Sequence, residues 1–410
     1  MNKTLIATAV SSALLACTLG QGAQADEAWT DDLNKMVTEG KVNFDFRYRY
    51  EFVDQDGISK DAGASTLRSR LTYNSGSLRG FSFITEFDNV SVIGSERYNS
   101  TENGKTQYPV VADPKGTDIN QAAIKYTAES ADGTYGRQRI LHSNQRFIGG
   151  VAWRQNEQTY DGFRANWKPT DALKLDYSYV YNVNRIFGPD DGANPANLHG
   201  ENHFVYLDYT FAEKHKFAGF AYLLDFDARG AYASGKTVDN SSDTYGLEYI
   251  GDFDILKLRA VYATQSDAGD NTRKYDADYY VVDVSGKLGM VNLNAGLEVL
   301  GAGDGVGFAT PLATLHKFQG WSDKFLTTPG DGIEDIYVGI TAKAGPVKLQ
   351  AIYHDFSAED GSDSYGQELD LAATWVVTKG FSTQLKYADY SADKFATDTT
   401  KVWLSFQLKI

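Results

Sequence analysis

Apolar and polar residues alternate strictly in KVNFDFRYRYEF, residues 41–52. A period of two places all the apolar side chains on one face of a β-strand and all the charged ones on the other. The same alternation recurs in LKLDYSYVYNV at 173–183 and in KVWLSFQLKI at 401–410. The pattern predicts a protein built from strands that each have one apolar and one charged face.

Segments of this kind continue along the chain after residue 40, and we count about eighteen, with sixteen as the alternative. Short connections such as 75–80 alternate with long polar ones such as 93–118 and 302–332. This alternation predicts an all-β fold over 41–410, an antiparallel up-and-down β-barrel with short periplasmic turns and long extracellular loops. The expected strands lie near 41–53, 65–75, 79–92, 119–129, 133–142, 158–168, 172–185, 201–212, 215–228, 242–252, 254–266, 275–287, 289–301, 333–344, 346–358, 365–377, 379–391 and 399–410.

Two features favour a transmembrane barrel over a secreted soluble all-β protein. The chain contains 26 Tyr and 22 Phe, and many of them fall on the apolar faces, as aromatic girdles at a membrane interface require. The segments also reach about ten residues or more, the length that a tilted strand needs to cross a bilayer. We therefore expect a barrel in the outer membrane of a Gram-negative bacterium, with lipids and the outer-membrane assembly machinery as partners.

The N-terminal sequence MNKTLIATAVSSALLACTLGQGAQA predicts a signal peptide over residues 1–25. An alternative reading takes Cys17 as a lipoprotein cysteine. Cys17 is the only cysteine, so cleavage after Ala25 leaves neither a disulfide nor a cysteine metal site. Residues 26–40 are then a short periplasmic N-terminal segment that could form a helix.

Charged residues inside the strands should face the lumen, because a lipid-facing Arg or Lys at mid-bilayer costs about 2–4 kcal/mol. The net charge is -15, and we expect much of the acidity to lie in the outer loops. A lumen lined by cations favours anions, although partners such as Asp88 for Arg70 could instead make structural ion pairs. The candidate pore-lining residues are Arg47, Arg49, Arg68, Arg70, Lys125, Arg137, Arg139, Arg164, Lys257 and Arg259.

Two connections contain further candidates. RQRILHSNQRFIGGVAWRQ, residues 137–155, places Arg146 and Arg154 in a loop near the outer mouth. The stretch 313–332 is long and aromatic, which favours a pore-constricting loop, with a cap over the outer mouth as the alternative. Its candidate residues are His316, Lys317, Phe318 and Trp321.

Enzyme motifs are missing from the sequence. The six histidines lack a nucleophile motif or a paired acidic site, and neither an H-E-x-x-H zinc motif nor an EF-hand loop is present. We therefore expect no catalytic residue, metal or cofactor, and no nucleic-acid partner.

The segment GRQRILHSNQRFIGGVAWRQNEQTYDGFR, residues 136–164, resembles the G-R-Q, R-F-x-G, W-R-Q and T-x-D-G signature of the alginate-export family of bacterial outer-membrane barrels. ATLHKFQGWSDKFLTTPGDGIEDIYVG, residues 313–339, resembles the family's C-terminal segment. The match makes Arg137, Arg139, Arg146 and Arg154 signature residues, with Arg164 just beyond. Ile410 departs from the terminal Phe or Trp that is common in such barrels.

The resemblance implies an eighteen-stranded barrel with an electropositive pore that passes an anionic uronate polysaccharide. Together with the candidate cations, it favours a passive channel for anionic oligo- or polysaccharides or small anions. Two alternatives remain at this level. One is a general diffusion porin with mild selectivity, and the other is a non-conducting structural or adhesion barrel.

Overall fold

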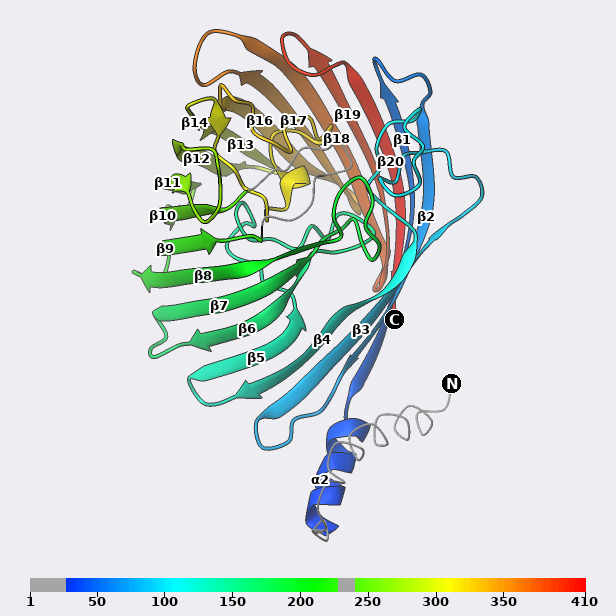
Figure 1. The fold of residues 1–410 in the computed structure, drawn as a ribbon, viewed down its shortest axis with the longest axis vertical. Helices are drawn as coiled ribbons and strands as arrows, with labels where there is room; N and C mark the ends of the chain where they lie inside the picture. Colours follow the sequence, from blue (N-terminus) through cyan, green and yellow to red (C-terminus); the bar gives the residue numbers. More distant parts are fainter. Residues whose placement is uncertain (1–26, 228–239) are drawn as a thin grey trace.

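The computed structural model describes residues 27–227 and 240–410 of the chain (Figure 1). The predicted signal peptide, residues 1–25, lies outside the described residues. Among those described, no helix is long and apolar enough to span a membrane.

Eighteen antiparallel strands form one closed sheet, which confirms the predicted up-and-down barrel. Each strand pairs with its neighbours in sequence, and the first strand also pairs with the last. The strands are β1 (Lys41–Gln55), β2 (Ala62–Asn74), β3 (Phe81–Val92), β4 (Gly116–Thr127), β5 (Ala131–Gln138), β6 (Thr159–Trp167), β7 (Leu173–Asn184), β8 (Asn197–Phe211), β9 (His215–Leu224), β10 (Ser242–Asp252), β11 (Leu256–Asp267), β12 (Asp276–Leu288), β13 (Val291–Leu300), β16 (Ile333–Ala344), β17 (Val347–Ser357), β18 (Ser364–Thr378), β19 (Phe381–Ala392) and β20 (Thr399–Lys409).

The seam between β1 and β20 closes the barrel. Their register runs from Asp45 opposite Lys409 to Gln55 opposite Thr399. Because every strand has a partner on both sides, the sheet leaves no row of unpaired backbone groups at an edge. The pairing is therefore suited to a bilayer, where water cannot hydrogen-bond to free amides.

The two faces of the wall differ as the alternation predicts. Outward-facing Leu247 on β10 is 69% exposed and Val338 on β16 is 55% exposed. Inward-facing Arg49 and Glu51 on β1 are only 1% and 0% exposed. These two charged side chains of β1 thus point to the interior, where other protein groups cover them.

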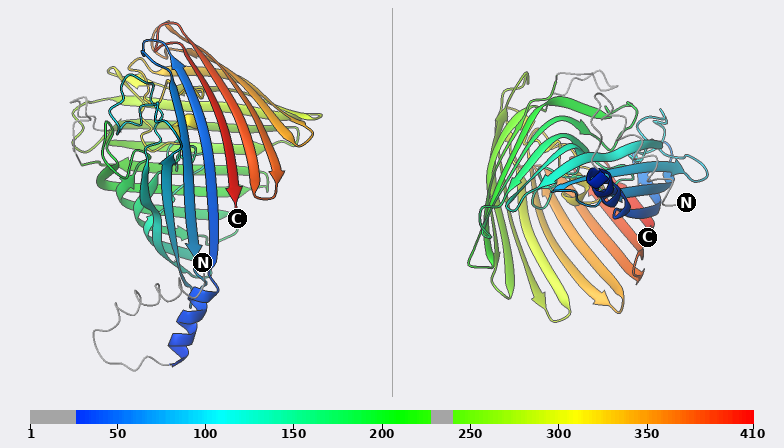
Figure 2. Two further views of the ribbon diagram at one scale, coloured as in Figure 1. Left: turned by 90° about the vertical axis from the view of Figure 1, so that its right-hand side faces the viewer. Right: turned by 90° about the horizontal axis from the view of Figure 1, so that it is seen from below.

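Short turns and long loops lie at opposite ends of the barrel (Figure 2). Helix α2 (Glu27–Thr38) lies at the short-turn end, beside the β2–β3 turn. There the Tyr73 hydroxyl donates to the Val37 carbonyl over 2.6 Å, and the Gly76 amide donates to the Met36 carbonyl over 2.7 Å. These contacts hold the helix against the rim of the barrel.

Some expected boundaries are corrected. A strand was expected over 133–142, but β5 ends at Gln138, so Arg139 belongs to the following loop. The connection 301–332 contains a small hairpin, β14 (Ala302–Gly303) with β15 (Val306–Gly307), and the 3₁₀ helix η1 (Leu315–Lys317). Its compact structure makes this loop a packed element of the interior.

The outward face can be tested with a charge at mid-strand. Leu247→Arg should lower the free energy of unfolding by about 2–4 kcal/mol, because Leu247 lies at the middle of β10 and faces lipid. Ile255→Arg is the matched control, since Ile255 is 76% exposed in the β10–β11 turn and should cost about 0–1 kcal/mol. Urea titration of the protein folded into phospholipid vesicles measures both; equal costs would contradict this assignment.

Candidate functional site

Two long loops fold into the barrel and pack against each other. They are loop 139–158, which joins β5 to β6, and loop 301–332, which joins β13 to β16. The Gly149 amide donates to the Leu312 carbonyl over 2.9 Å, and the Thr314 amide donates to the Gln145 carbonyl over 3.0 Å. Figure 1 shows the second loop, in yellow, within the ring of strands. This loop therefore fills part of the lumen and does not cap the mouth.

Asp323 joins the two loops to the wall. Its Oδ1 accepts a hydrogen bond from His316 Nδ1 at 2.8 Å. Its Oδ2 lies 2.9 Å from Lys401 Nζ on β20 and 3.2 Å from Arg154 Nη2 on the other loop. Burial alone would raise the pKa of the Asp323 carboxyl, but the Lys401 cation, the hydrogen bond from His316 and the Arg154 cation outweigh it and hold that pKa well below its usual range.

Arg146 and Arg154 are buried inside the protein, where they bind carboxylates of the barrel wall. The structure does not place them as free groups at the outer mouth. Arg154 is 7% exposed, and its second partner is Glu51 on β1 at 3.0 Å. Arg146 is 1% exposed, donates to Glu298 on β13 at 2.7 Å, and lies 4.7 Å above the Phe318 ring. Phe318 therefore packs against the guanidinium of Arg146, which binds the wall.

Most of the predicted pore-lining cations also have carboxylate partners. Arg70 bridges Asp88 at 2.6 Å and Glu157 at 2.9 Å, so the proposed Arg70–Asp88 pair is present. Arg139 binds Glu157 at 2.6 Å and also pairs with Glu86. The remaining pairs are Arg68 with Asp45 (3.0 Å), Lys125 with Asp132 (3.2 Å), Arg137 with Asp161 (2.8 Å), Arg164 with Asp176 (3.0 Å from Nε to Oδ1), Lys257 with Asp252 (3.3 Å) and Arg259 with Glu248 (2.7 Å).

The interior of the described part of the barrel is not uniformly basic, because its buried carboxylates outnumber its buried Lys and Arg residues. The acidity expected mainly in the outer loops thus extends into the wall, where it neutralises the arginines. The carboxylates are Glu51, Glu86, Asp88, Asp113, Glu157, Asp176, Glu248, Glu298, Asp335, Glu368 and Asp370; the cations are Arg47, Arg49, Arg68, Arg70, Arg146, Arg154, Lys386 and Lys401.

One cavity differs from the rest of the interior in the charge of its lining. It has a volume of about 510 Å³ and is lined by four cations, Arg47, Arg49, Lys317 and Lys386, and by no carboxylate. We call it the basic cavity. Its other lining residues are Ala152, Trp153, Thr314, His316 and Trp321 from the two loops, and Gln350, Ala372, Thr374, Ser382, Thr383, Gln384, Ser405 and Gln407 from β17–β20.

The two arginines of the basic cavity are held mainly by neutral groups. Arg47 donates to Gln155 Oε1 at 3.0 Å and to the Ala152 carbonyl at 2.9 Å. Arg49 lies 4.1 Å from the Trp153 ring centroid, and its nearest carboxylate, Asp113, is 3.8 Å away. Its Nε and Nη1 lack a hydrogen-bond partner within the described structure, so this guanidinium retains donor capacity.

Lys386 from β19 lies between indole rings. Its ammonium is 3.7 Å from the Trp321 ring centroid and 3.9 Å from that of Trp153, distances at which a cation is attracted to the ring face. It also donates to His316 Nε2 at 2.9 Å. Burial, reinforced by this lysine, lowers the pKa of His316 well below its usual value, so the ring is neutral and can accept that bond.

Lys317, in η1, is the fourth cation and donates to the Asn144 carbonyl over 2.9 Å. Within the described ranges, neither Lys317, Lys386 nor Arg47 forms an ion pair with a carboxylate. Three of the four cations of the cavity thus have no adjacent acid in the described structure that neutralises their charge, and the fourth, Arg49, has Asp113 at 3.8 Å.

Sequence reasoning found part of this site. It named Arg47, Arg49, His316, Lys317 and Trp321, which the fold brings together. It missed Lys386 and Trp153. The signal for Lys386 was present, since Leu385 and Tyr387 occupy the apolar positions on either side of it in β19. Trp153 offered no such signal, because it lies in a loop without periodicity.

No group of three or more metal-ligating side chains occurs in the described part of the chain. The side chains that line the basic cavity carry ammonium, guanidinium, hydroxyl, amide, imidazole and indole groups.

The tether at Asp323 can be tested by neutralising it. Asp323→Asn leaves Arg154 and Lys401 without this carboxylate, so the barrel should lose about 3–5 kcal/mol of stability and its conductance should rise as the loops separate. Asp331→Asn, an exposed change in the same loop, is the control.

Because the pKa of Asp323 is depressed, the stabilising effect of its carboxylate is complete above the ordinary carboxyl range and is lost only as pH falls through the lower folded-state pKa. Single-channel recording at several pH values measures the conductance of both variants. Identical conductance in Asp323→Asn and Asp331→Asn would contradict the role of Asp323 in holding the loops.

Comparison with known proteins agrees with the architecture. The family described as "Alginate export" matches residues 39–296. Among solved structures, Pseudomonas aeruginosa OccK3 (OpdO) is 14% identical, with 94% of this chain and 99% of that chain covered and a TM-score of 0.70. Acinetobacter baumannii OccAB4 is 16% identical, with 90% and 98% covered and a TM-score of 0.66. Pseudomonas aeruginosa OpdK is 13% identical, with 91% and 99% covered and a TM-score of 0.67.

No curated protein matched the chain. The solved structures share the eighteen-stranded porin fold at low identity, and the matched family covers more than half of the sequence. The chain therefore belongs to the alginate export family, and it is an outer-membrane, porin-like β-barrel channel.

Proposed function

We propose that this channel passes anionic solutes by passive diffusion and that they bind in transit in the basic cavity. The observation that supports the proposal is the lining itself, with four cations and no carboxylate in an interior otherwise rich in ion pairs. An anion that enters this cavity meets four cations, of which only Arg49 has a carboxylate of the described chain, Asp113, within 4 Å. The same anion beside Arg70 or Arg139 would meet Glu157.

The residues of the cavity suit a carboxylate attached to a hydroxylated ring. A guanidinium offers paired N–H donors that match a carboxylate, and an ammonium adds a mobile point charge. Gln350, Gln384 and Gln407 on β17, β19 and β20 offer amide groups to hydroxyls. The indoles of Trp153 and Trp321 supply flat apolar surface, so uronate units are the substrate class that these groups fit best.

Release is as important as binding in a channel, because conduction requires the solute to leave. Lys386 is held against indoles and Arg47 by neutral oxygen atoms, so an entering carboxylate does not have to displace a resident acid from them. The neutral partners recover these cations when the solute departs. The site is therefore suited to binding of modest strength.

Two of the comparisons are consistent with an organic anion as the transported solute. The matched family is described by alginate export, and the Pseudomonas aeruginosa OpdK structure contains vanillate. In this chain, the basic cavity would hold the charged group of such a solute between the two loops and strands β17–β20.

The cations can be tested by removing the two lysines. Lys317→Gln with Lys386→Gln should shift the reversal potential in a KCl gradient toward zero and weaken binding of a uronate disaccharide. The loss should be about tenfold for each lysine, since a hydrogen bond to a charged group contributes about 1.5–3 kcal/mol. Planar-bilayer recording measures both quantities.

The matched control is Arg137→Gln with Asp161→Asn, which removes a charge-balanced pair outside the cavity. This variant should keep the wild-type reversal potential. If the control and the lysine variant shift selectivity equally, the basic cavity is not the selective element.

Solute permeation separates the proposed channel from its alternatives. Liposomes containing the protein should take up mannuronate disaccharides faster than neutral disaccharides of the same size, because only the former gain contacts with the cations. Liposome swelling measures the two rates. Equal rates would identify a general diffusion porin, and a barrel that conducts neither ions nor sugars would identify a structural role.

A further inference from the structure

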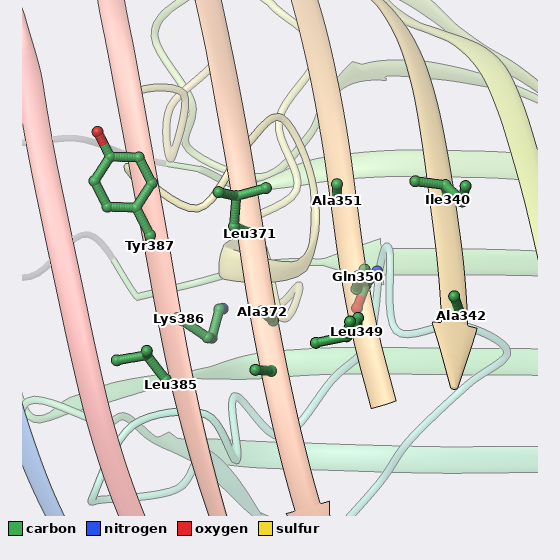
Figure 3. A pocket seen from close by; sticks show the side chains of 11 residues that line it. Ile340, Ala342, Leu349, Gln350, Ala351, Leu371, Ala372, Leu385, Lys386 and Tyr387 are labelled. Carbon is green, nitrogen blue, oxygen red and sulfur yellow. The ribbon is translucent and has the colours of Figure 1, made fainter. Parts of the chain in front are cut away.

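A pocket opens on the outer surface of the barrel over β16–β19 (Figure 3). It has a volume of about 430 Å³, and apolar side chains make up most of its lining. We call it the outer groove. Two rows of paired residues cross it, namely Ile340, Ala351, Leu371 and Tyr387 in one row, and Ala342, Leu349, Ala373 and Leu385 in the other.

The groove faces the bilayer. Leu349 is 43% exposed and Leu385 is 52% exposed. The residues next to them in the same strands, Gln350 and Lys386, have the opposite orientation in the alternation, and they border both the outer groove and the basic cavity. The outer groove and the basic cavity thus lie on opposite sides of one wall.

Small residues cause the depression. Ala342, Ala351 and Ala373 occupy successive strands, and larger side chains stand beside each of them in both rows. An empty groove in the hydrocarbon layer would forfeit dispersion contacts along its floor. A flexible acyl chain can follow such a channel between the larger side chains and restore these contacts.

Basic residues gather where the same strands meet the short-turn end. Lys343 and Lys348 lie directly opposite each other in the β16–β17 hairpin, and Lys379 lies in the β18–β19 turn. All three are exposed, and none forms an ion pair with a described carboxylate. Like charges facing each other in a sheet are destabilising, so an anion at this rim would relieve their repulsion.

The placement of these lysines fits a lipid headgroup. Lys343 and Lys348 have the strand orientation of the lumen face, but each lies within two residues of the hairpin turn. A long aliphatic stem lets the ammonium group reach around the end of the hairpin to the interface. Trp375, 43% exposed on the outer face between the groove and the rim, marks the depth at which aromatic girdles lie.

We propose that the outer groove binds one anionic glycerophospholipid of the periplasmic leaflet, with an acyl chain along the alanines and the phosphate at Lys343, Lys348 and Lys379. The charged rim favours a lipid over a second copy of the barrel, because a second copy would bring the same lysines together at a shared interface. This site is independent of the solute that the channel carries.

Native mass spectrometry of the full-length protein, released from mixed phosphatidylglycerol and phosphatidylcholine micelles, tests the proposal. The wild type should retain phosphatidylglycerol preferentially. Ala351→Leu with Ala373→Leu fills the groove and should abolish retention of both lipids. Replacing Lys343, Lys348 and Lys379 with Gln should leave acyl-chain retention but reduce the preference for phosphatidylglycerol by about fivefold for each lysine.

Ala295→Leu on β13 is the matched control, because Ala295 is an exposed residue of the outer face beyond the groove. Heat-dependent migration on gels confirms that each variant forms a barrel. Unchanged lipid retention in the filled variant would overturn the proposal. So would loss of an oligomer in that variant by light scattering in detergent, which would identify a second copy as the occupant.

Discussion

The closed ladder of backbone hydrogen bonds is the constraint on which the rest of this structure depends. A bilayer offers no water to unpaired amides, so a sheet can cross it only when the last strand returns to the first. The pairing of β1 with β20 meets that requirement. Once the sheet closes, the alternation of residues with a period of two decides which face of the sheet each side chain occupies. Leu247 faces lipid, whereas Arg49 faces the interior.

A second constraint acts inside the barrel. Charges withdrawn from water must be paired or held by hydrogen bonds, since an isolated buried charge is very costly. The wall therefore contains carboxylates for most of its arginines, and the inward loops take part in the same pairing through Arg146, Arg154 and Asp323. The basic cavity is the exception, because indoles, amides and carbonyls hold its cations. A site that must bind and release anions benefits from such weakly engaged cations.

The basic cavity and the outer groove lie on the two faces of one part of the barrel wall. Strands β17–β19 present mostly polar residues to the basic cavity and mostly apolar residues to the outer groove. Lys386 is directly adjacent to Leu385 and Tyr387, so substitutions that alter packing on one side act close to the other. The proposed lipid site therefore lies next to the elements that form the proposed solute site, although the two rest on separate observations.

Sequence periodicity was sufficient to predict the strand number, the sense of each face and the inward direction of Arg47 and Arg49, because these depend on local alternation alone. It was insufficient for Arg146 and Arg154, whose carboxylate partners Glu298 and Asp323 lie more than 150 residues away in the chain. The same limit explains why a basic lumen was expected where the structure shows mostly paired charges. The sequence by itself determined the closed barrel and which residues face its interior, through the period of two. Only the tertiary structure decided which cations are neutralised and which remain available, because that depends on how loops 139–158 and 301–332 pack within the lumen.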